Sequence, residues 1–145
     1  MKFYEFFCFK IEELKNYTSI AFDLDGTLIG DNYYKHCFWD FISKNKNIDY
    51  FIVTFRERKE CVSLWEEIEK ESNGLLTKNN FKTHDFFIDN FVKQNNNELK
   101  LWKGFVCANI GAQILVDDMQ ELVIEGCKKY GIDFFNSKTL SLRKF

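Results

Sequence analysis

The sequence contains no proline, only two histidines and only three arginines among its 145 residues. Asparagine is abundant instead, and there are 17 lysines. Codons rich in A and T would produce this bias without any structural cause. The bias therefore indicates a low-GC genome, bacterial or phage, and it says nothing about function.

The sequence also lacks an apolar run long enough to cross a membrane, since a spanning helix needs about 20 apolar residues. The apolar stretch at the start of the chain is interrupted by Glu5 and Lys10. It has no small-residue cleavage site of the kind that ends a signal peptide. We therefore expect neither a leader nor a membrane partner, and a cytoplasmic location.

The cysteines lack the patterns that mark metal sites. The five of them, at positions 8, 37, 61, 107 and 127, form no C-x-x-C pair and have no histidine at ligand spacing. Their odd number and wide spacing favour reduced thiols in a cytoplasmic compartment. We expect the cysteines, together with His36 and His84, to pack in the interior or to face solvent.

An excess of positive charge is missing as well, because the formal net charge is -2 and the pI is about 5.7. Proteins that coat a duplex contact many phosphates through a broad basic surface. That class is therefore excluded. A site that grips one terminal phosphate needs only a few local cations, so nucleotides and nucleic-acid ends remain possible substrates.

Apolar residues are plentiful: 46% of the chain is hydrophobic, and 17 residues are phenylalanine. A domain of this length can bury roughly two-thirds of the surface that its unfolded chain exposes. No linker, repeat or low-complexity tract divides the sequence. We expect one domain over residues 1–145, with a core at about 19–136 and an aromatic N-terminal segment at 1–18.

Short apolar runs alternate with helical patterns along the chain. After an N-terminal segment that is either a strand or a helix, with Phe3, Phe7, Ile11 and Leu14 on one face, we predict strands at 19–24, 50–53, 85–88, 114–116 and 132–135. The predicted helices are 33–43, 57–71, 98–109 and 119–130. This alternation predicts an α/β fold: a three-layer α/β/α sandwich around a Rossmann-like parallel sheet of about five strands, without a large cap domain.

Polar residues stand where three of these strands end. They are Asp23 with Asp25, Thr54 with Arg56, and Asp117 with Asp118. Each pair alone has an ordinary structural explanation: a turn, a strand end, or the cap of a helix. Together they predict one site, because reactive groups in parallel sheets gather at the carboxyl ends of the strands.

The most specific motif is Asp23-Leu24-Asp25-Gly26-Thr27, directly after an apolar strand. With it, the sequence resembles the haloacid dehalogenase-like superfamily, whose first motif is a strand followed by Asp-x-Asp-Gly-Thr. The second motif of that superfamily is similar to residues 51–54, and the fourth to residues 114–118. The resemblance covers roughly residues 19–136 and follows the family's order of motifs.

The resemblance implies a Mg²⁺-dependent phosphatase. Asp23 would be the nucleophile and would form an aspartyl-phosphate, while the Asp25 side chain would serve as general acid and then as base. The metal ligands would be Asp23, Asp117 and the backbone carbonyl of Asp25, which are hard oxygen donors suited to Mg²⁺. Asp118 would either support the metal through water or cap the last helix.

Aspartate at position 25 also favours a reaction class within the resemblance. Relatives that dehalogenate, or that pump ions through a stable phosphoenzyme, carry other residues there. A proton-transferring Asp25 favours hydrolysis of a phosphomonoester and, less often, phosphomutase chemistry.

The remaining candidates would bind the phosphate. Thr54 would donate a hydrogen bond to a phosphate oxygen, and Arg56 would either add a forked contact or lie in solvent at a helix start. The family's third motif is a lysine, for which Lys100 and Lys103 are candidates. We favour Lys100, because family lysines tend to enter from the helix start; the other interpretation is that one or both lysines solvate a surface helix.

The spacing leaves little room for a cap domain, with 30 residues between Asp23 and Thr54 and 45 between Thr54 and Lys100. We therefore expect an open site that suits macromolecular phosphates such as nucleic-acid ends, or that needs oligomerisation to handle small substrates.

A receiver-type signalling domain is excluded by motif order, because a receiver places its acidic pair before the acceptor aspartate. A catalytically idle module that binds phosphate or a protein partner stays open as an alternative.

Overall fold

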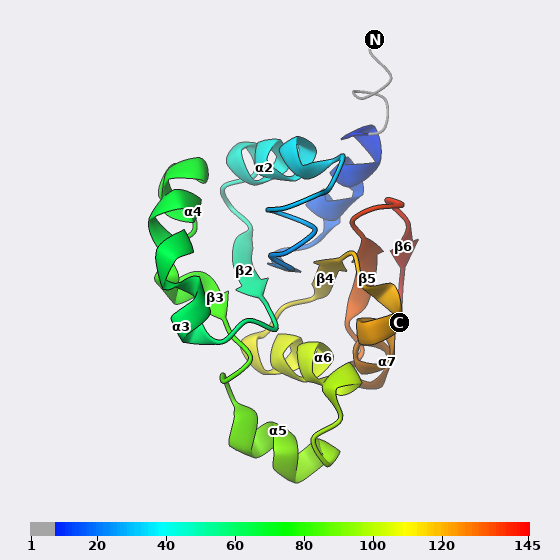
Figure 1. The fold of residues 1–145 in the computed structure, drawn as a ribbon. Helices are drawn as coiled ribbons and strands as arrows, with labels where there is room; N and C mark the ends of the chain where they lie inside the picture. Colours follow the sequence, from blue (N-terminus) through cyan, green and yellow to red (C-terminus); the bar gives the residue numbers. More distant parts are fainter. Residues whose placement is uncertain (1–7) are drawn as a thin grey trace.

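A computed structural model describes residues 8–145 of the chain. Its strands are β1 (Ser19–Phe22), β2 (Asp49–Val53), β3 (Phe81–Lys82), β4 (Ile114–Asp117), β5 (Asp133–Asn136) and β6 (Leu142–Arg143). They form one sheet of six strands in the order β3-β2-β1-β4-β5-β6 (Figure 1). Neighbouring strands from β3 to β5 are parallel, and β6 pairs antiparallel with β5.

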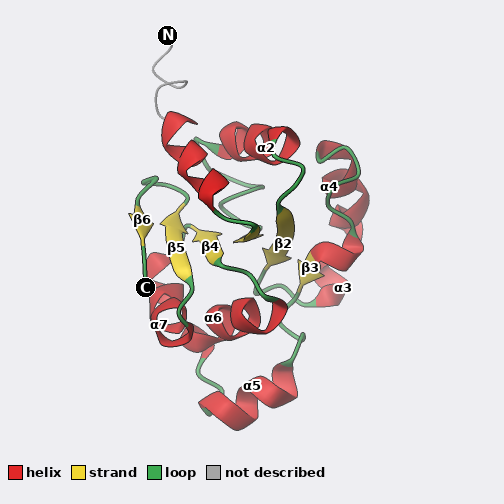
Figure 2. Ribbon diagram, turned by 180° about the vertical axis from the view of Figure 1, so that it is seen from behind, coloured by secondary structure: helices red, strands yellow, loops and turns green. Residues whose placement is uncertain are grey.

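Helices cover both faces of this sheet (Figures 1 and 2). They are η1 (Phe9–Asn16), α2 (Lys35–Lys44), α3 (Arg58–Cys61), η2 (Val62–Leu64), α4 (Trp65–Glu71), η3 (Lys78–Asn80), α5 (Ile88–Asn95), α6 (Leu99–Ile110) and α7 (Gln120–Tyr130). Buried residues of η1, α2 and α4 belong to one core, and those of α5, α6 and α7 belong to the other. None of the helices among residues 8–145 combines the length and the apolar character that a membrane crossing requires.

Side-chain alternation along the central strands produces these two cores. In β1, Ile20 and Phe22 belong to the core beneath α2, whereas Ala21 belongs to the core beneath α6. Successive strand residues point to opposite faces, so a strand buried on both sides is apolar throughout. The mixed α/β fold with a mostly parallel sheet is thus confirmed, and its layers are compatible with a three-layer sandwich.

The prediction of a strand at 85–88 is wrong. The third strand is the short β3, and residues 85–87 form a turn that leads into α5. The Phe86 N–H donates to the Thr83 carbonyl at 2.8 Å, and the Thr83 hydroxyl donates to the Asp85 carboxylate. Phe87 then adopts a left-handed backbone with φ of 60°. These local contacts compete with strand pairing and win here.

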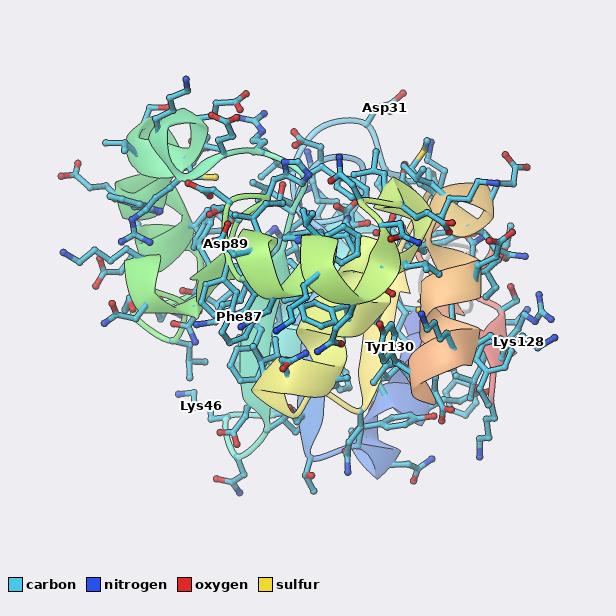
Figure 3. The ribbon with its side chains drawn as sticks, turned by 90° about the horizontal axis from the view of Figure 1, so that it is seen from below. Asp31, Lys46, Phe87, Asp89, Lys128 and Tyr130 are labelled. Carbon is cyan, nitrogen blue, oxygen red and sulfur yellow. A yellow bond between two sulfur atoms is a disulfide. The ribbon has the colours of Figure 1, made fainter. Side chains whose placement is uncertain are left out.

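The aromatic residues of this turn serve the packing of α5 rather than the sheet. The Phe87 and Phe105 ring centroids lie 6.4 Å apart, and the ring centroids of Phe105 and Tyr130 lie 5.9 Å apart. Figure 3 shows the molecule from below, with α5 across the outside of α6 and with Phe87 and Tyr130 labelled. The α5 helix therefore extends the layer formed by α6.

Two further predictions need correction. The helix expected over 57–71 is broken into α3, η2 and α4. Near the N-terminus, η1 is a 3₁₀ helix that buries Ile11 and Leu14, while Phe3 and Phe7 of the proposed apolar face lie outside the described residues.

The expectation of reduced thiols is wrong for one pair of cysteines. Cys8 and Cys37 form a disulfide that links the start of η1 to α2, with their Cα atoms 5.6 Å apart. Cys61, Cys107 and Cys127 are free and buried, as expected. The disulfide ties the N-terminal segment to the face of the sheet that α2 covers.

Candidate active site

The predicted site residues lie at the carboxyl edge of the sheet. Asp23 directly follows β1, and Asp117 is the last residue of β4, the strand beside it. The Asp23 N–H donates to the Val116 carbonyl at 2.8 Å, so the two strand ends are held side by side. From β1 the chain runs outward to β2 on one side, while β4 lies on the other. The site is therefore at the point where strand order reverses, the common place for a ligand in such sheets.

Lys103 connects the two aspartates. Its Nζ atom lies 2.7 Å from Asp23 Oδ1 and 2.6 Å from Asp117 Oδ2, and all three side chains are buried. Lys100, in contrast, is exposed and lies 3.9 Å from Glu125 on α7. The structure thus places Lys103 at the site and Lys100 outside it, which corrects our preference for Lys100.

The position of Lys103 depends on how closely α6 approaches α7. A Cβ atom added to Gly104 would lie 2.2 Å from the backbone of Gly126, and one added to Gly126 would lie 2.9 Å from the Lys100 carbonyl. Only glycine fits at this crossing. The close contact holds α6 in a position from which the Lys103 side chain reaches the carboxyl edge of the sheet.

The electrostatics of this cluster follow from burial and the crowding of acids. Burial raises the pKa of Asp23 to about 8; the Lys103 charge opposes this rise and the Asp117 charge adds to it. Burial alone would lower the pKa of Lys103, but the carboxylates of Asp117 and Asp23 outweigh it, so the pKa is raised. Lys103 stays charged, and its Nζ also lies 4.6 Å from the centroid of the Phe55 ring.

Asp118 brings a third carboxylate to the cluster. One oxygen atom each of Asp23, Asp117 and Asp118 lie within 4.8 Å of one another, close enough to surround one cation. Within the described part of the chain, Asp118 Oδ1 is buried without a hydrogen-bond partner. A buried carboxylate oxygen costs free energy unless it is paired. The other oxygen, Oδ2, lies 3.8 Å from Lys138 Nζ. The unpartnered Oδ1, beside two further hard donors, fits a divalent cation.

The alternative role for Asp118, as the cap of the last helix, is not seen. The first residue before α7 is Met119, and no side chain caps the helix there. Gly26 lies against Asp118 instead: with φ of 82°, its position would place an added Cβ 2.5 Å from Asp118 Oδ2. Glycine at this turn lets the Asp118 carboxylate approach the loop that carries Asp25.

The Asp25 side chain does not belong to the cluster of three acids and pairs with Arg56 instead. Arg56 Nε donates to Asp25 Oδ2 at 2.8 Å, and Nη2 donates to Oδ1 at 2.7 Å, a forked ion pair. Arg56 is therefore not a residue that simply lies in solvent. The pair orients the Asp25 carboxylate at the rim of the site.

Thr54 follows β2 and is buried beside the cluster. Its Oγ1 atom accepts a hydrogen bond from the Arg56 N–H at 3.1 Å. The hydroxyl hydrogen remains available to donate. Thr54, Arg56, Asp23, Asp25 and Lys103 all line one hollow of about 340 Å³, together with Phe55, Glu60, Met119 and Leu122.

The loop after Gly26 is held by polar contacts from distant parts of the chain. Asn32 Nδ2 donates to the Gly26 carbonyl at 2.8 Å and to the Ser137 carbonyl at 3.1 Å, and the hydroxyls of Thr27 and Ser137 lie 2.9 Å apart. Asn32 and Ser137 were not predicted, because isolated polar residues in loops carry no distinctive pattern. Phe55 was missed for a similar reason, since it lies just after a strand of apolar residues.

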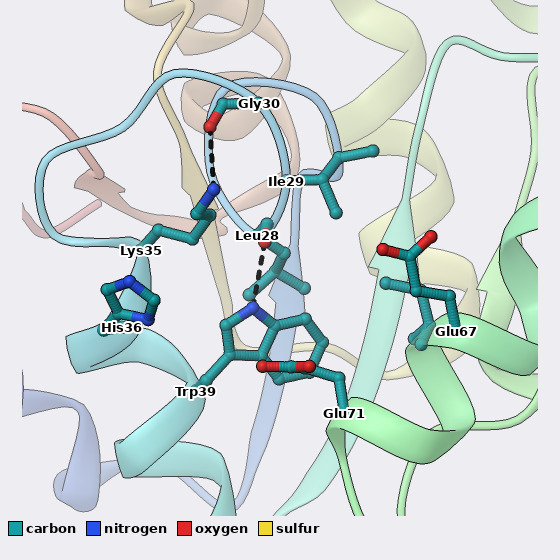
Figure 4. A pocket seen from close by; sticks show the side chains of 9 residues that line it. Leu28, Ile29, Gly30, Lys35, His36, Trp39, Glu67 and Glu71 are labelled. Carbon is teal, nitrogen blue, oxygen red and sulfur yellow. Dashed lines mark hydrogen bonds between the residues drawn. The ribbon is translucent and has the colours of Figure 1, made fainter.

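A second hollow, of about 260 Å³, is lined by residues of this loop, of α2 and of α4 (Figure 4). Within it, Trp39 Nε1 donates to the Leu28 carbonyl at 2.9 Å, and Lys35 Nζ donates to the Gly30 carbonyl at 3.1 Å. These bonds anchor the loop to α2. His36 lines the same hollow and is exposed, as expected for a residue outside the site.

The sequence matches no protein-family model, no curated protein and no solved structure.

Proposed function

We propose that this protein is a Mg²⁺-dependent phosphomonoester hydrolase of the haloacid dehalogenase-like type. The observation that carries the proposal is the convergence of Asp23, Asp117 and Lys103 at the ends of β1 and β4. A carboxylate that attacks a phosphoryl group needs positive charge around it, because both partners are anionic. Lys103 supplies one such charge.

Asp23, Asp117 and Asp118 would hold the metal, with the Asp25 backbone carbonyl as a further donor. When bound, Mg²⁺ supplies charge neutralisation for the nucleophile and the phosphate. The unpartnered Asp118 oxygen supports this assignment.

The chain's own residues supply the remaining steps. An oxygen of Asp23 forms a bond to phosphorus while the bond from phosphorus to the leaving oxygen breaks, and Asp25, which must be protonated and released from Arg56 for this step, gives that oxygen a proton. Thr54 donates to a phosphoryl oxygen. Water, deprotonated by Asp25, then attacks the same phosphorus atom. Inorganic phosphate leaves, and the Asp23 carboxylate is restored.

The test is turnover of an aryl phosphate with Mg²⁺ by the wild type and by Asp23→Asn. The variant should lose activity by more than about a thousandfold, because the nucleophile is removed. Asp40→Asn is the matched control, since Asp40 is exposed on α2 and outside the site. Thermal unfolding checks that both variants fold.

Equal, slow turnover by wild type and Asp23→Asn would contradict the proposal. It would favour the alternative, a catalytically idle module that binds phosphate or a protein partner. If the wild type is active, the substrate class is identified by a screen of nucleoside monophosphates, 3′-phosphorylated oligonucleotides, sugar phosphates and phosphopeptides.

A further inference from the structure

The mouth of the proposed active site is apolar, although its floor is charged. Met119 is 53% exposed at the rim, and Leu122 and Phe55 line the wall of the same hollow. A contiguous patch of exposed apolar side chains, rather than a single one, is typical of a surface that contacts a ligand. The apolar wall lies beside Asp25, the proposed proton donor to the leaving group.

This wall continues into a neighbouring hollow of about 470 Å³ between the starts of α6 and α7. Leu122 lines both hollows, and Leu99, which is 44% exposed, lines the second. Leu99 precedes Lys103 by four residues on α6, so both lie on one side of that helix, about 6 Å apart along its axis. The two hollows share Leu122, with Met119 lining the inner one and Leu99 the outer one, and we call these three side chains the apolar groove.

The charges around this groove are mainly acidic. Glu60 stands at the inner end, and Glu98 and Glu125 line the outer hollow, where Lys100 is the one cation among the described lining residues. The Arg56 charge is already paired with Asp25. Phosphodiester groups of a polynucleotide would meet repulsion here.

We propose that the groove of Met119, Leu122 and Leu99 binds the leaving group of the substrate, and that this group is an uncharged apolar chain. The inference rests on the proposed phosphatase function and narrows it. Phosphomonoesters of apolar alcohols fit the groove, whereas the nucleic-acid ends named above do not.

The test compares ethyl phosphate with hexyl phosphate. The two alcohols are similar leaving groups, so a difference in kcat/KM reports the binding of the longer chain. Four extra methylene groups, partly buried, should raise kcat/KM of the wild type by roughly tenfold or more. A 3′-phosphorylated oligonucleotide should be a poorer substrate than hexyl phosphate.

Leu99→Ser should lower the kcat/KM for hexyl phosphate relative to that for ethyl phosphate, so that the ratio of the two values falls toward one. Val92→Ser is the matched control, because Val92 is 41% exposed on α5 and does not line the groove. The control should keep the wild-type ratio. Thermal unfolding of both variants checks their folding.

An active wild type that treats both esters equally, or that prefers the oligonucleotide, would overturn the inference and leave the proposed function standing. If the wild type releases no phosphate from any ester, the proposed function fails. Binding of hexylphosphonate and ethylphosphonate, measured by calorimetry, still tests the groove in that case: equal affinities reject it, and a tighter hexyl compound that Leu99→Ser weakens supports it.

Discussion

Lys103 is buried between two carboxylates, so removing its charge would leave buried charges unpaired. Three carboxyl groups meet in a small volume with Lys103 between two of them, while Lys138 Nζ lies 3.8 Å from the third, Asp118, so the acids outnumber the lysines. Removing one partner from a buried ion pair costs much more than the pair itself contributes, because a charge is left unpaired. The cluster is therefore better explained as a binding site than as a source of stability.

Replacing Lys103 by methionine should reduce aryl phosphate turnover by roughly 100-fold or more, since a cation at the reacting group is lost. The same change should lower the free energy of unfolding by about 3 kcal/mol, because Asp23 and Asp117 stay buried together. Steady-state kinetics and urea unfolding measure the two effects.

Lys100→Met is the matched control, as Lys100 lies on the same helix with an exposed side chain. It should change neither turnover nor stability by more than a small factor. If Lys100→Met were the damaging substitution, the placement of Lys103 would be wrong.

Asp23 makes cation binding depend on pH. Its pKa is raised to about 8, so at neutral pH the carboxyl of the metal-free protein holds a proton that a cation must displace. Mg²⁺ affinity should therefore rise with pH and level off above about pH 8, with a proton released on binding. Calorimetry in two buffers of different ionisation enthalpy measures this release at neutral pH.

The stability of the folded protein changes with pH in the opposite direction to the Mg²⁺ affinity. A carboxyl with a raised folded-state pKa contributes stability that is complete below its ordinary pKa of 3.8 and is lost as pH rises through about 8. Ionisation of the Asp23 carboxyl should therefore make the metal-free protein less stable at about pH 9 than at about pH 6. A Mg²⁺ affinity that does not change with pH would show that Asp23 is ionised throughout.

Among the helices and strands, the close packing of α6 against α7 determines the position of Lys103. Gly104→Ala should lower the free energy of unfolding by about 1–3 kcal/mol, because the new Cβ would overlap the Gly126 backbone. Helix propensity alone would give the opposite sign, a gain of about 1 kcal/mol. Urea unfolding distinguishes the two.

Ala108→Ser, at an exposed position on α6, is the control and should have little effect. A stabilised Gly104→Ala protein would mean that the two helices are not in close contact.

The sequence was enough to predict the elements whose pattern is strong. β1 is apolar after Ser19 and leads to Asp23, and the three residues of β4 before Asp117 are apolar, so the position and the meeting point of the two strands could be predicted. The choice between Lys100 and Lys103 could not, because both lie in the first turns of one helix. What separates them is the contact between Gly104 and Gly126, which depends on how two helices pack against each other.

The strand placed at 85–88 failed for a different reason. An apolar run of Phe86, Phe87 and Ile88 has the composition of a strand, but the Thr83 and Asp85 side chains close a turn before it. The actual strand, β3, has only two residues at the edge of the sheet. So short an element leaves no periodic pattern to recognise.

At the scale of the whole molecule, the sheet and its connections use nearly the entire chain. The segment between β2 and α6 is occupied by α3, η2, α4, η3, β3 and α5. The loop after Gly26 is held instead by Ser137, beyond β5, through its contacts with Thr27 and Asn32. The site is thus stabilised by contacts between distant parts of the chain, and its mouth stays open toward α6 and α7.

In the proposed reaction, Asp23 receives a phosphoryl group at the site where the ends of β1 and β4 meet. Rapid quenching during turnover, followed by borohydride reduction and peptide mapping, locates an acyl-phosphate directly. We expect a reduced residue at position 23 when Mg²⁺ is present and none when it is chelated. A phosphorylated residue elsewhere, or steady turnover without any acyl-phosphate, would contradict it.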